Sequence, residues 1–195
     1  MFSLDDLVQK FDCERCGRGD GKFDKAKLAA IVFEHLKSPA LTTAEAYVDG
    51  LLPLFAKAGV SPSRDEIARA LPLFRERGQT LVQTADLMDY LFRDPPAQDE
   101  KAVKKFLTKE RAPLLRKLAD AFRAASAFDV ATLDEAMKAL LAAEGVELKE
   151  IAQAARVALT GRSASPGLFE VAVLLGRDRS VRRLLAAADV AERAG

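Results

Sequence analysis

The sequence predicts an all-α fold, with two packed helical-bundle units and a short helical segment at the N-terminus. No stretch alternates apolar and polar residues as a half-buried strand would. Apolar residues instead recur near the helical period, in segments that begin at Ser, Thr or Asp and end at Gly or before Pro. The connections between these segments are short, as in helical bundles.

Five helices are predicted in the first half of the chain. Ser3 caps the first, with Asp5 and Asp6 in its first turn, where the helix dipole favours acidic side chains. Asp24 caps the second, which ends before Pro39. The expected ranges are Ser3–Phe11, Asp24–Lys37, Thr42 or Thr43 to Ala58, Ser63–Arg75 and Thr80–Phe92.

The second of these helices has an apolar side. Helical spacing brings Leu28, Ile31, Val32 and Leu36 to one face, so we expect them to be buried. His35, the one histidine of the chain, lies on the same helix. A lone histidine among apolar residues is more often packed or at the surface than a ligand, so no role is assigned to it.

Arg93–Ala97 is the clearest linker in the chain. Pro95 and Pro96 force extended backbone and forbid a helix at this point. The sequence therefore predicts three parts, which are an N-terminal segment at residues 1–40, a first helical unit at 41–97 and a second helical unit at 98–195.

Six helices are predicted after the linker. Thr132 and Glu135 form a capping box at the start of one helix, Gly145 ends it, and Asp178 caps the last helix. The expected ranges are Gln98–Leu107, Arg111–Ala125, Thr132–Ala143, Glu147–Thr160, Pro166–Leu175 and Asp178–Ala188.

A short cationic loop, Gly161–Ser165, joins two of these helices. Ser165 is a strong N-cap residue and Pro166 suits the first helical position, so both are expected to open the next helix. Arg162 in the loop and Arg156 behind it place two guanidinium groups beside that helix start, an arrangement that suits phosphates or exposed base edges. Helix, turn and helix is also ordinary packing. The expected apolar stripes are Leu148, Ile151, Ala155, Val157 and Leu159 before the loop, and Phe169, Val173 and Leu174 after it.

The composition is that of a globular protein, with 49% hydrophobic and 30% charged residues. No apolar run is long enough for a membrane span, and the N-terminus has acids where a signal peptide needs bases, so we expect a cytoplasmic protein. The net charge of +1 argues against a large general surface for polyanions. The charge is uneven, however: residues 1–100 carry 13 basic and 17 acidic residues, whereas residues 101–195, which contain the loop, carry 17 and 12.

The two cysteines, Cys13 and Cys16, have the spacing of half a zinc site. Four ligands are needed and the chain has one histidine, so no metal is expected and the thiols are taken as reduced and structural. The stretch Cys16–Lys27 mimics a calcium loop with Gly21 at its turn, but its first and last positions lack ligand oxygens in their side chains.

Two runs of residues carry a resemblance to a known family. Arg156–Gly161 (RVALTG) and Ser165–Glu170 (SPGLFE) resemble, in order and spacing, the C-terminal end of bacterial glutamate–tRNA ligases. These are class I aminoacyl-tRNA synthetases whose last domains bind the anticodon. The likeness extends more loosely to Met1–Leu4. It implies that the anticodon-binding residues here include Arg156, Arg162, Ser165, Pro166 and Leu168.

Arg77 is a further candidate through the same resemblance. An arginine at this position in the family reads the third anticodon base, and belongs to enzymes that accept glutamate tRNA and refuse glutamine tRNA. From the residues alone, Arg77 reads as a solvated arginine at a helix C-terminus. The family pattern fits Phe23-Asp24 and Lys27-Leu28 as well. The chain departs from it at Ala30, Val32, Phe33 and His35, where the family has Trp, Asn, Gly and Tyr in a tract close to the tRNA body.

No catalytic arrangement is found in the sequence. One histidine cannot supply the paired-histidine signature of a class I synthetase or a catalytic triad, and no phosphate loop is present. The chain alone is therefore not expected to be an enzyme or to hold a cofactor. Two functions remain: a tRNA-binding module for a glutamate-type anticodon loop, either a stand-alone paralogue or a piece of a longer enzyme, and a helical scaffold that binds a separate protein and no longer binds tRNA. Neither a membrane nor DNA is an expected partner.

Overall fold

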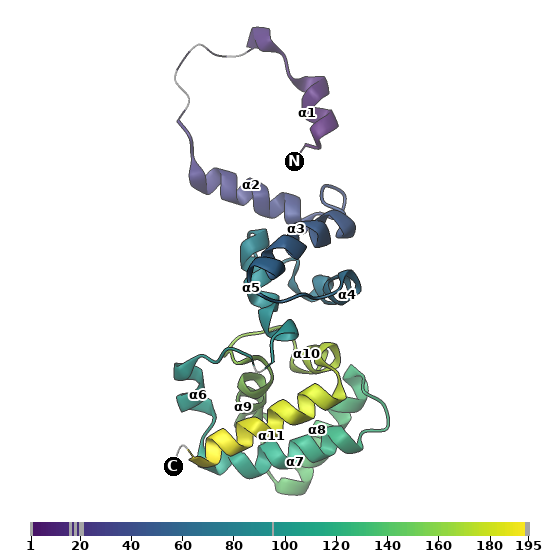
Figure 1. The fold of residues 1–195 in the computed structure, drawn as a ribbon, viewed down its shortest axis with the longest axis vertical. Helices are drawn as coiled ribbons and strands as arrows, with labels where there is room; N and C mark the ends of the chain where they lie inside the picture. Colours follow the sequence, from purple (N-terminus) through teal and green to yellow (C-terminus); the bar gives the residue numbers. More distant parts are fainter. Residues whose placement is uncertain (1, 16, 18, 20–21, 95, 194–195) are drawn as a thin grey trace. The chain divides into compact units, whose positions relative to one another are not determined.

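The computed structural model describes residues 2–15, 17, 19, 22–94 and 96–193 (Figure 1). All regular secondary structure in these ranges is helical, which confirms the predicted all-α class. The chain forms two compact units, one of residues 1–87 and one of residues 88–195. The three-part division at residues 40 and 97 stays a prediction.

Within its described residues, the first unit holds four helices and the start of a fifth. The helices are α1 (Leu4–Lys10), α2 (Lys25–Lys37), α3 (Ala44–Lys57), α4 (Arg64–Phe74) and α5 (Leu81–Phe92), with a short 3-10 turn, η1 (Cys13–Arg15), after α1. Ser3, Asp24, Thr43 and Ser63 cap α1 to α4 as their residue types predict.

The core of the first unit lies between α3, α4 and α5. Tyr47, Leu51 and Phe55 from α3 are buried with Ile67 and Phe74 from α4. The Tyr47 hydroxyl lies 2.9 Å from the Thr84 hydroxyl of α5, so the buried polar atom has a partner.

The prediction of a buried apolar side on α2 is wrong. Leu36 is the one buried residue of this helix, while Leu28 is 46% and Ile31 is 41% exposed. Within the described residues, α1 buries no side chain. Periodicity shows which residues share a face, but it does not show whether another element covers that face.

In the part of the second unit that the structure describes, the end of α5 is followed by six further helices. These are α6 (Glu100–Phe106), α7 (Ala112–Ala124), α8 (Val130–Glu144), α9 (Leu148–Thr160), α10 (Leu168–Leu175) and α11 (Arg177–Arg193), with a 3-10 turn, η2 (Lys109–Arg111), before α7. α11 packs along α7 and against α9 (Figure 1). The core includes Leu115, Leu118, Phe122, Leu133, Met137, Ile151, Val157 and Leu184.

The predicted caps of α8 and α11 are wrong, whereas the predicted glycine stop of α8 is confirmed. α8 begins two residues before Thr132, because the Asp129 carboxylate accepts the Thr132 N–H at 2.8 Å and takes the place of the predicted Thr132–Glu135 box. α11 begins at Arg177, so Asp178 lies in its first turn and is not its cap. Gly145 ends α8 in the left-handed conformation, as expected.

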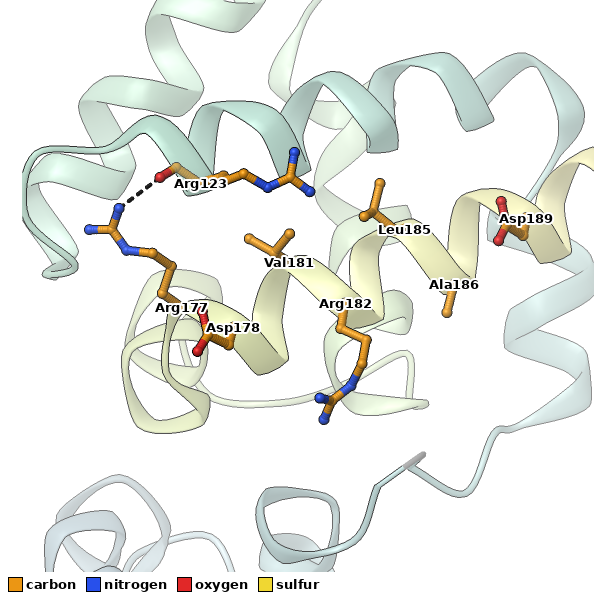
Figure 2. Close-up of a pocket in the computed structure, with 8 residues that line it drawn as sticks. All are labelled: Arg123, Arg177, Asp178, Val181, Arg182, Leu185, Ala186 and Asp189. Carbon is orange, nitrogen blue, oxygen red and sulfur yellow. Dashed lines mark hydrogen bonds between the residues drawn. The ribbon is translucent and has the colours of Figure 1, made fainter.

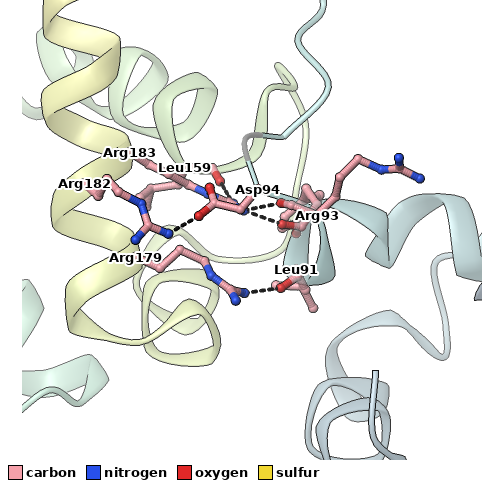
Figure 3. A network of polar contacts seen from close by, with 8 residues as sticks. Leu91, Arg93, Asp94, Leu159, Arg179, Arg182 and Arg183 are labelled. Carbon is pink, nitrogen blue, oxygen red and sulfur yellow. Dashed lines mark hydrogen bonds and ion pairs between the residues drawn. The ribbon is translucent and has the colours of Figure 1, made fainter. Parts of the chain in front are cut away.

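A buried guanidinium group joins three helices of the second unit. The Arg183 side chain of α11 donates to the carbonyl oxygens of Tyr90 at 2.8 Å, Arg93 at 2.6 Å and Leu159 at 2.5 Å (Figure 3). These oxygens lie at the ends of α5 and α9, where a helix leaves carbonyl groups without an internal partner. Asp94 lies 3.4 Å from the same guanidinium group and also pairs with Arg182.

Burial and charge oppose each other at this network. Burial lowers the pKa of Arg183 to about 10, against the opposite effect of Asp94, so the side chain keeps its charge at neutral pH. Burial would raise the pKa of Asp94, but its contacts with Arg182 and Arg183 outweigh this and lower it.

Replacing Arg183 with Met should lower the free energy of unfolding by about 2–4 kcal/mol, because three carbonyl groups lose their donor. Urea denaturation followed by circular dichroism measures this change. Arg182→Ala is the matched control, because Arg182 contacts the same carboxylate from an exposed position. An Arg183→Met variant no less stable than Arg182→Ala would contradict a central role for the buried group.

Candidate functional site

The loop between α9 and α10 begins where predicted, but it ends later. Gly161 follows the last residue of α9 with a φ of 70°, in the left-handed region that glycine favours. Gly167 is the residue that precedes α10, so Ser165 is not an N-cap and Pro166 is not the first helical residue. The Ser165 hydroxyl donates to the Pro166 carbonyl oxygen at 2.9 Å, so it does not serve an amide of the helix.

The helix after the loop also buries different residues from those expected. Val171, Ala172 and Leu175 are its buried positions, whereas the predicted Phe169, Val173 and Leu174 are only half-buried. Every residue of this helix except Glu170 is apolar, so the sequence pattern does not show which face is buried. In α9 the predicted stripe is buried apart from Leu148, which is 51% exposed; the buried members are Ile151, Ala155, Val157 and Leu159.

Arg156 holds the far side of the loop. One nitrogen of its guanidinium group donates to the carbonyl oxygens of Ser165 at 3.2 Å and Pro166 at 2.8 Å, and to the Ser165 hydroxyl. The structure thus brings together three of the residues that the sequence selected. Because this group is half-buried and engaged by the loop itself, Arg156 can fix the loop's shape as well as add positive charge.

Thr160 holds the near side of the loop. Its buried hydroxyl lies 2.7 Å from the Arg156 carbonyl oxygen and 3.1 Å from that of Arg162, and it accepts the Arg162 N–H at 3.1 Å. From the sequence, Thr160 was expected only to end a helix. A threonine directly before the glycine of a helix stop is the signal that could have predicted these contacts, because its hydroxyl can reach the backbone on both sides.

The linker after α5 lies against the start of the loop. The Asp99 N–H donates to the Gly161 carbonyl oxygen at 2.8 Å. A side chain at Gly161 would place its Cβ 2.1 Å from the Ala97 carbonyl oxygen, which is too close for any real contact. Gly161 is therefore required by this close approach as well as by its φ.

The charge at the start of α10 disfavours a phosphate there. The Glu170 carboxylate lies against Gly167, since a Cβ built on that glycine would be 2.0 Å from a carboxylate oxygen. An acid in the first turn stabilises the helix dipole, and it would repel an incoming phosphate. Of the two predicted ligand types, exposed base edges fit this loop better than phosphates.

The remaining predicted residues differ in exposure. Arg162 and Leu168 are half-buried, Pro166 is buried, and Ser163 and Ala164 form the exposed tip. Arg77 belongs to the first unit and is described there alone: it is exposed, and its Nε donates to the Leu73 carbonyl oxygen at 2.9 Å. This is the helix-end contact expected from the residues alone.

Apart from the loop, the second unit has a hollow of about 490 Å³ on α11 (Figure 2). Arg177 donates to the Arg123 carbonyl oxygen at 2.7 Å, and Arg123 and Arg182 pair with Asp120 and Asp94. These guanidinium groups already make contacts within the protein, and two carboxylates share the lining, so the hollow is a poor site for an anion. Its lining is Arg123, Arg177, Asp178, Val181, Arg182, Leu185, Ala186 and Asp189.

Other kinds of site find little support in the part of the chain that the structure describes. No cluster of three or more His, Cys, Asp or Glu residues there could hold a metal ion. Cys13 is an exposed free thiol, whereas Cys16 and Gly21, on which the zinc and calcium comparisons depended, lie outside the described residues. None of the described helices has the length and apolar character needed to cross a membrane.

The chain is similar to proteins of known family along nearly its whole length. A family model described as "Anticodon binding domain" matches residues 33–188. Glutamate–tRNA ligase from Anaeromyxobacter dehalogenans is 37% identical over 100% of this chain and 40% of its own length. The same enzyme from Geobacter sulfurreducens is 34% identical over 94% of this chain and 39% of its own length. The chain thus spans about two-fifths of these relatives, and the predicted resemblance is confirmed.

A solved structure extends this likeness to the fold. The crystal structure of a glutamate tRNA ligase from Elizabethkingia meningosepticum matches 96% of this chain and 37% of its own chain, with a TM-score of 0.81 at 22% sequence identity.

Gly161→Ala should destabilise the protein more than Gly145→Ala. Both glycines have a left-handed φ, but a Cβ at Gly145 meets no atom within 4 Å. Gly145→Ala should therefore cost about 1–2 kcal/mol from backbone conformation alone. Gly161→Ala adds a clash with the Ala97 carbonyl oxygen. The extra loss in the free energy of unfolding, relative to Gly145→Ala, therefore reports how closely the linker packs against the loop. Equal losses in the two variants would show that the linker does not press on the loop in solution.

Proposed function

Because the chain belongs to the family of anticodon binding domains, we propose that it binds the anticodon stem-loop of a tRNA and does not aminoacylate by itself. The observation that supports this most is the loop at residues 161–167, which Arg156 and Thr160 fix from both sides and whose tip is exposed. The names of the relatives support glutamate tRNA as the proposed ligand, and a tRNA ligand supports a cytoplasmic location.

The chemistry of the loop suits unstacked bases. Bases splayed out of an anticodon loop present donors and acceptors on their Watson–Crick edges. The exposed Ser163 hydroxyl and the loop backbone can meet both kinds of group, and the half-buried Leu168 offers an apolar contact to a base. Arg162 adds positive charge beside them. The role of Pro166, which is buried, is to shape the loop.

Binding should be weak and should fall with salt. The net charge is only +1, so few phosphate contacts are available, and each one releases counterions on binding. Titration of a fluorescent anticodon stem-loop at low and moderate salt tests the proposal, with a stem-loop of scrambled anticodon as control. Arg162→Ala should weaken binding. Equal affinity for both stem-loops, or an affinity that is independent of salt, would exclude an anticodon-binding role.

Arg77 is proposed to read the third anticodon base. A guanidinium group offers only donors, which match the O2 and N3 acceptors of cytosine and oppose the N–H donors on guanine. Its exposed position leaves it accessible, and the one described hydrogen bond of its side chain, to the Leu73 carbonyl oxygen, uses a single donor.

The Arg77→Gln variant should lose its preference for a stem-loop with C over one with G at the third position. We expect wild type to differ between the two by roughly tenfold, because a donor that faces a donor costs about 1–3 kcal/mol. Arg69→Gln is the matched control, since Arg69 is exposed on α4, the helix that Arg77 follows, and its Nε also donates to a carbonyl oxygen four residues earlier. Wild-type protein with equal affinity for C and G would contradict this role.

A separate protein as partner is the second candidate, and the N-terminal segment favours it. Large apolar side chains there are exposed, which is unusual for so many neighbouring residues. In the RNA titration, absence of binding by wild type would leave this helical scaffold as the better account. The exposed side chains are Phe2, Leu4, Leu7, Val8, Phe11, Phe23, Leu28 and Ile31.

A further inference from the structure

The hydroxyl group of Thr160 lies between the helix and the loop that it precedes. It contacts the Arg156 carbonyl oxygen at 2.7 Å inside α9, and both the N–H and the carbonyl oxygen of Arg162 at 3.1 Å beyond Gly161. One buried side-chain atom thus contacts the backbone of Arg156, which fixes the other end of the loop, and of Arg162, which is proposed to add positive charge beside the anticodon.

We infer that Thr160 is the positioning residue that sets the direction of the loop toward the anticodon. The inference rests on the proposed function. Thr160 is fully buried, so it acts through Arg162 and the loop tip and not by touching RNA. A loop fixed before binding loses less conformational entropy when RNA arrives, which raises affinity without a new contact.

The surrounding contacts show why this hydroxyl matters for the loop. Gly161 in its left-handed conformation turns the chain, but a glycine by itself leaves the next residue many conformations. Arg156 fixes the other end of the loop at Ser165 and Pro166. Between these points, the Arg162 N–H donates to the Thr160 hydroxyl at 3.1 Å, and this hydrogen bond orients the first half of the loop.

Three variants separate loop positioning from ordinary stability. Thr160→Val keeps the side-chain shape and removes the hydroxyl, whereas Thr160→Ser keeps the hydroxyl. Thr84→Val is the matched control in the first unit, because the buried Thr84 hydroxyl also bonds to the carbonyl oxygen four residues earlier, at 3.1 Å, and to a second partner, Tyr47. All three are compared by urea unfolding, by amide hydrogen exchange at residues 161–165, and by anticodon stem-loop titration.

We expect Thr160→Val to speed amide exchange at Arg162 and to weaken stem-loop binding by about tenfold, the factor typical of one lost hydrogen bond. Thr160→Ser should restore both. Thr84→Val should lose stability, but its loop exchange and RNA affinity should equal those of wild type.

The outcomes distinguish this inference from the proposed function. If wild type binds the stem-loop and Thr160→Val binds it equally well, or if Thr84→Val loses as much affinity, Thr160 is not a positioning residue. If wild type binds no stem-loop, the proposed function fails. Unchanged exchange at Arg162 in Thr160→Val then rejects the loop-setting role as well, whereas faster exchange keeps that role for a loop whose ligand is not tRNA.

Discussion

The guanidinium group of Arg183 lies where the end of α5, the end of α9 and the middle of α11 meet. A helix end that is buried without partners for its carbonyl groups is costly, and here two such ends share one charged donor. The guanidinium group keeps its charge in the interior because Asp94 faces it and three carbonyl oxygens accept hydrogen bonds from it. The position of α9 in the second unit, and with it the starting point of the candidate loop, depends on this group.

The Arg183 contacts determine where the loop starts, and contacts over a shorter range determine its shape. Leu159, whose carbonyl oxygen binds Arg183, directly precedes Thr160, whose hydroxyl binds the first residues of the loop. The chain at Ala97 and Asp99 then presses on Gly161 from outside. Each contact is individually modest in energy, but together they leave the exposed tip little freedom. A loop that already has a fixed conformation before its ligand arrives can discriminate between ligands of different shape.

Local sequence rules predicted the helices well, because caps, glycine stops and proline breaks act over a few residues. Ser63 with Glu66, Thr43 and Gly145 behave as their residue types require. The failures come from competition at longer range. Ser165 looks like a cap, but the Arg156 guanidinium group binds it, and the helix begins later. The Arg183 network could not be predicted, because it depends on which distant chain segments meet. The contacts of Thr160 are local, and its place directly before a helix-stop glycine is the sequence signal that could have marked it.

At the candidate site, a sequence that matches the family motif does not by itself show which ligand the folded site favours. Arg156 and Ser165 stand in the spacing typical of the family, and spacing alone suggested two cationic groups at a helix start ready for phosphate. In the structure one of those groups is used by the loop, and Glu170 places a negative charge at that helix start. Contacts to base edges determine which RNA sequence is bound, whereas contacts to the RNA phosphates mainly fix the orientation of the protein. A near-neutral protein with such a site is therefore better suited to contact base edges than to neutralise the RNA phosphate backbone. Selectivity for an anticodon thus fits this surface better than strong general affinity for RNA.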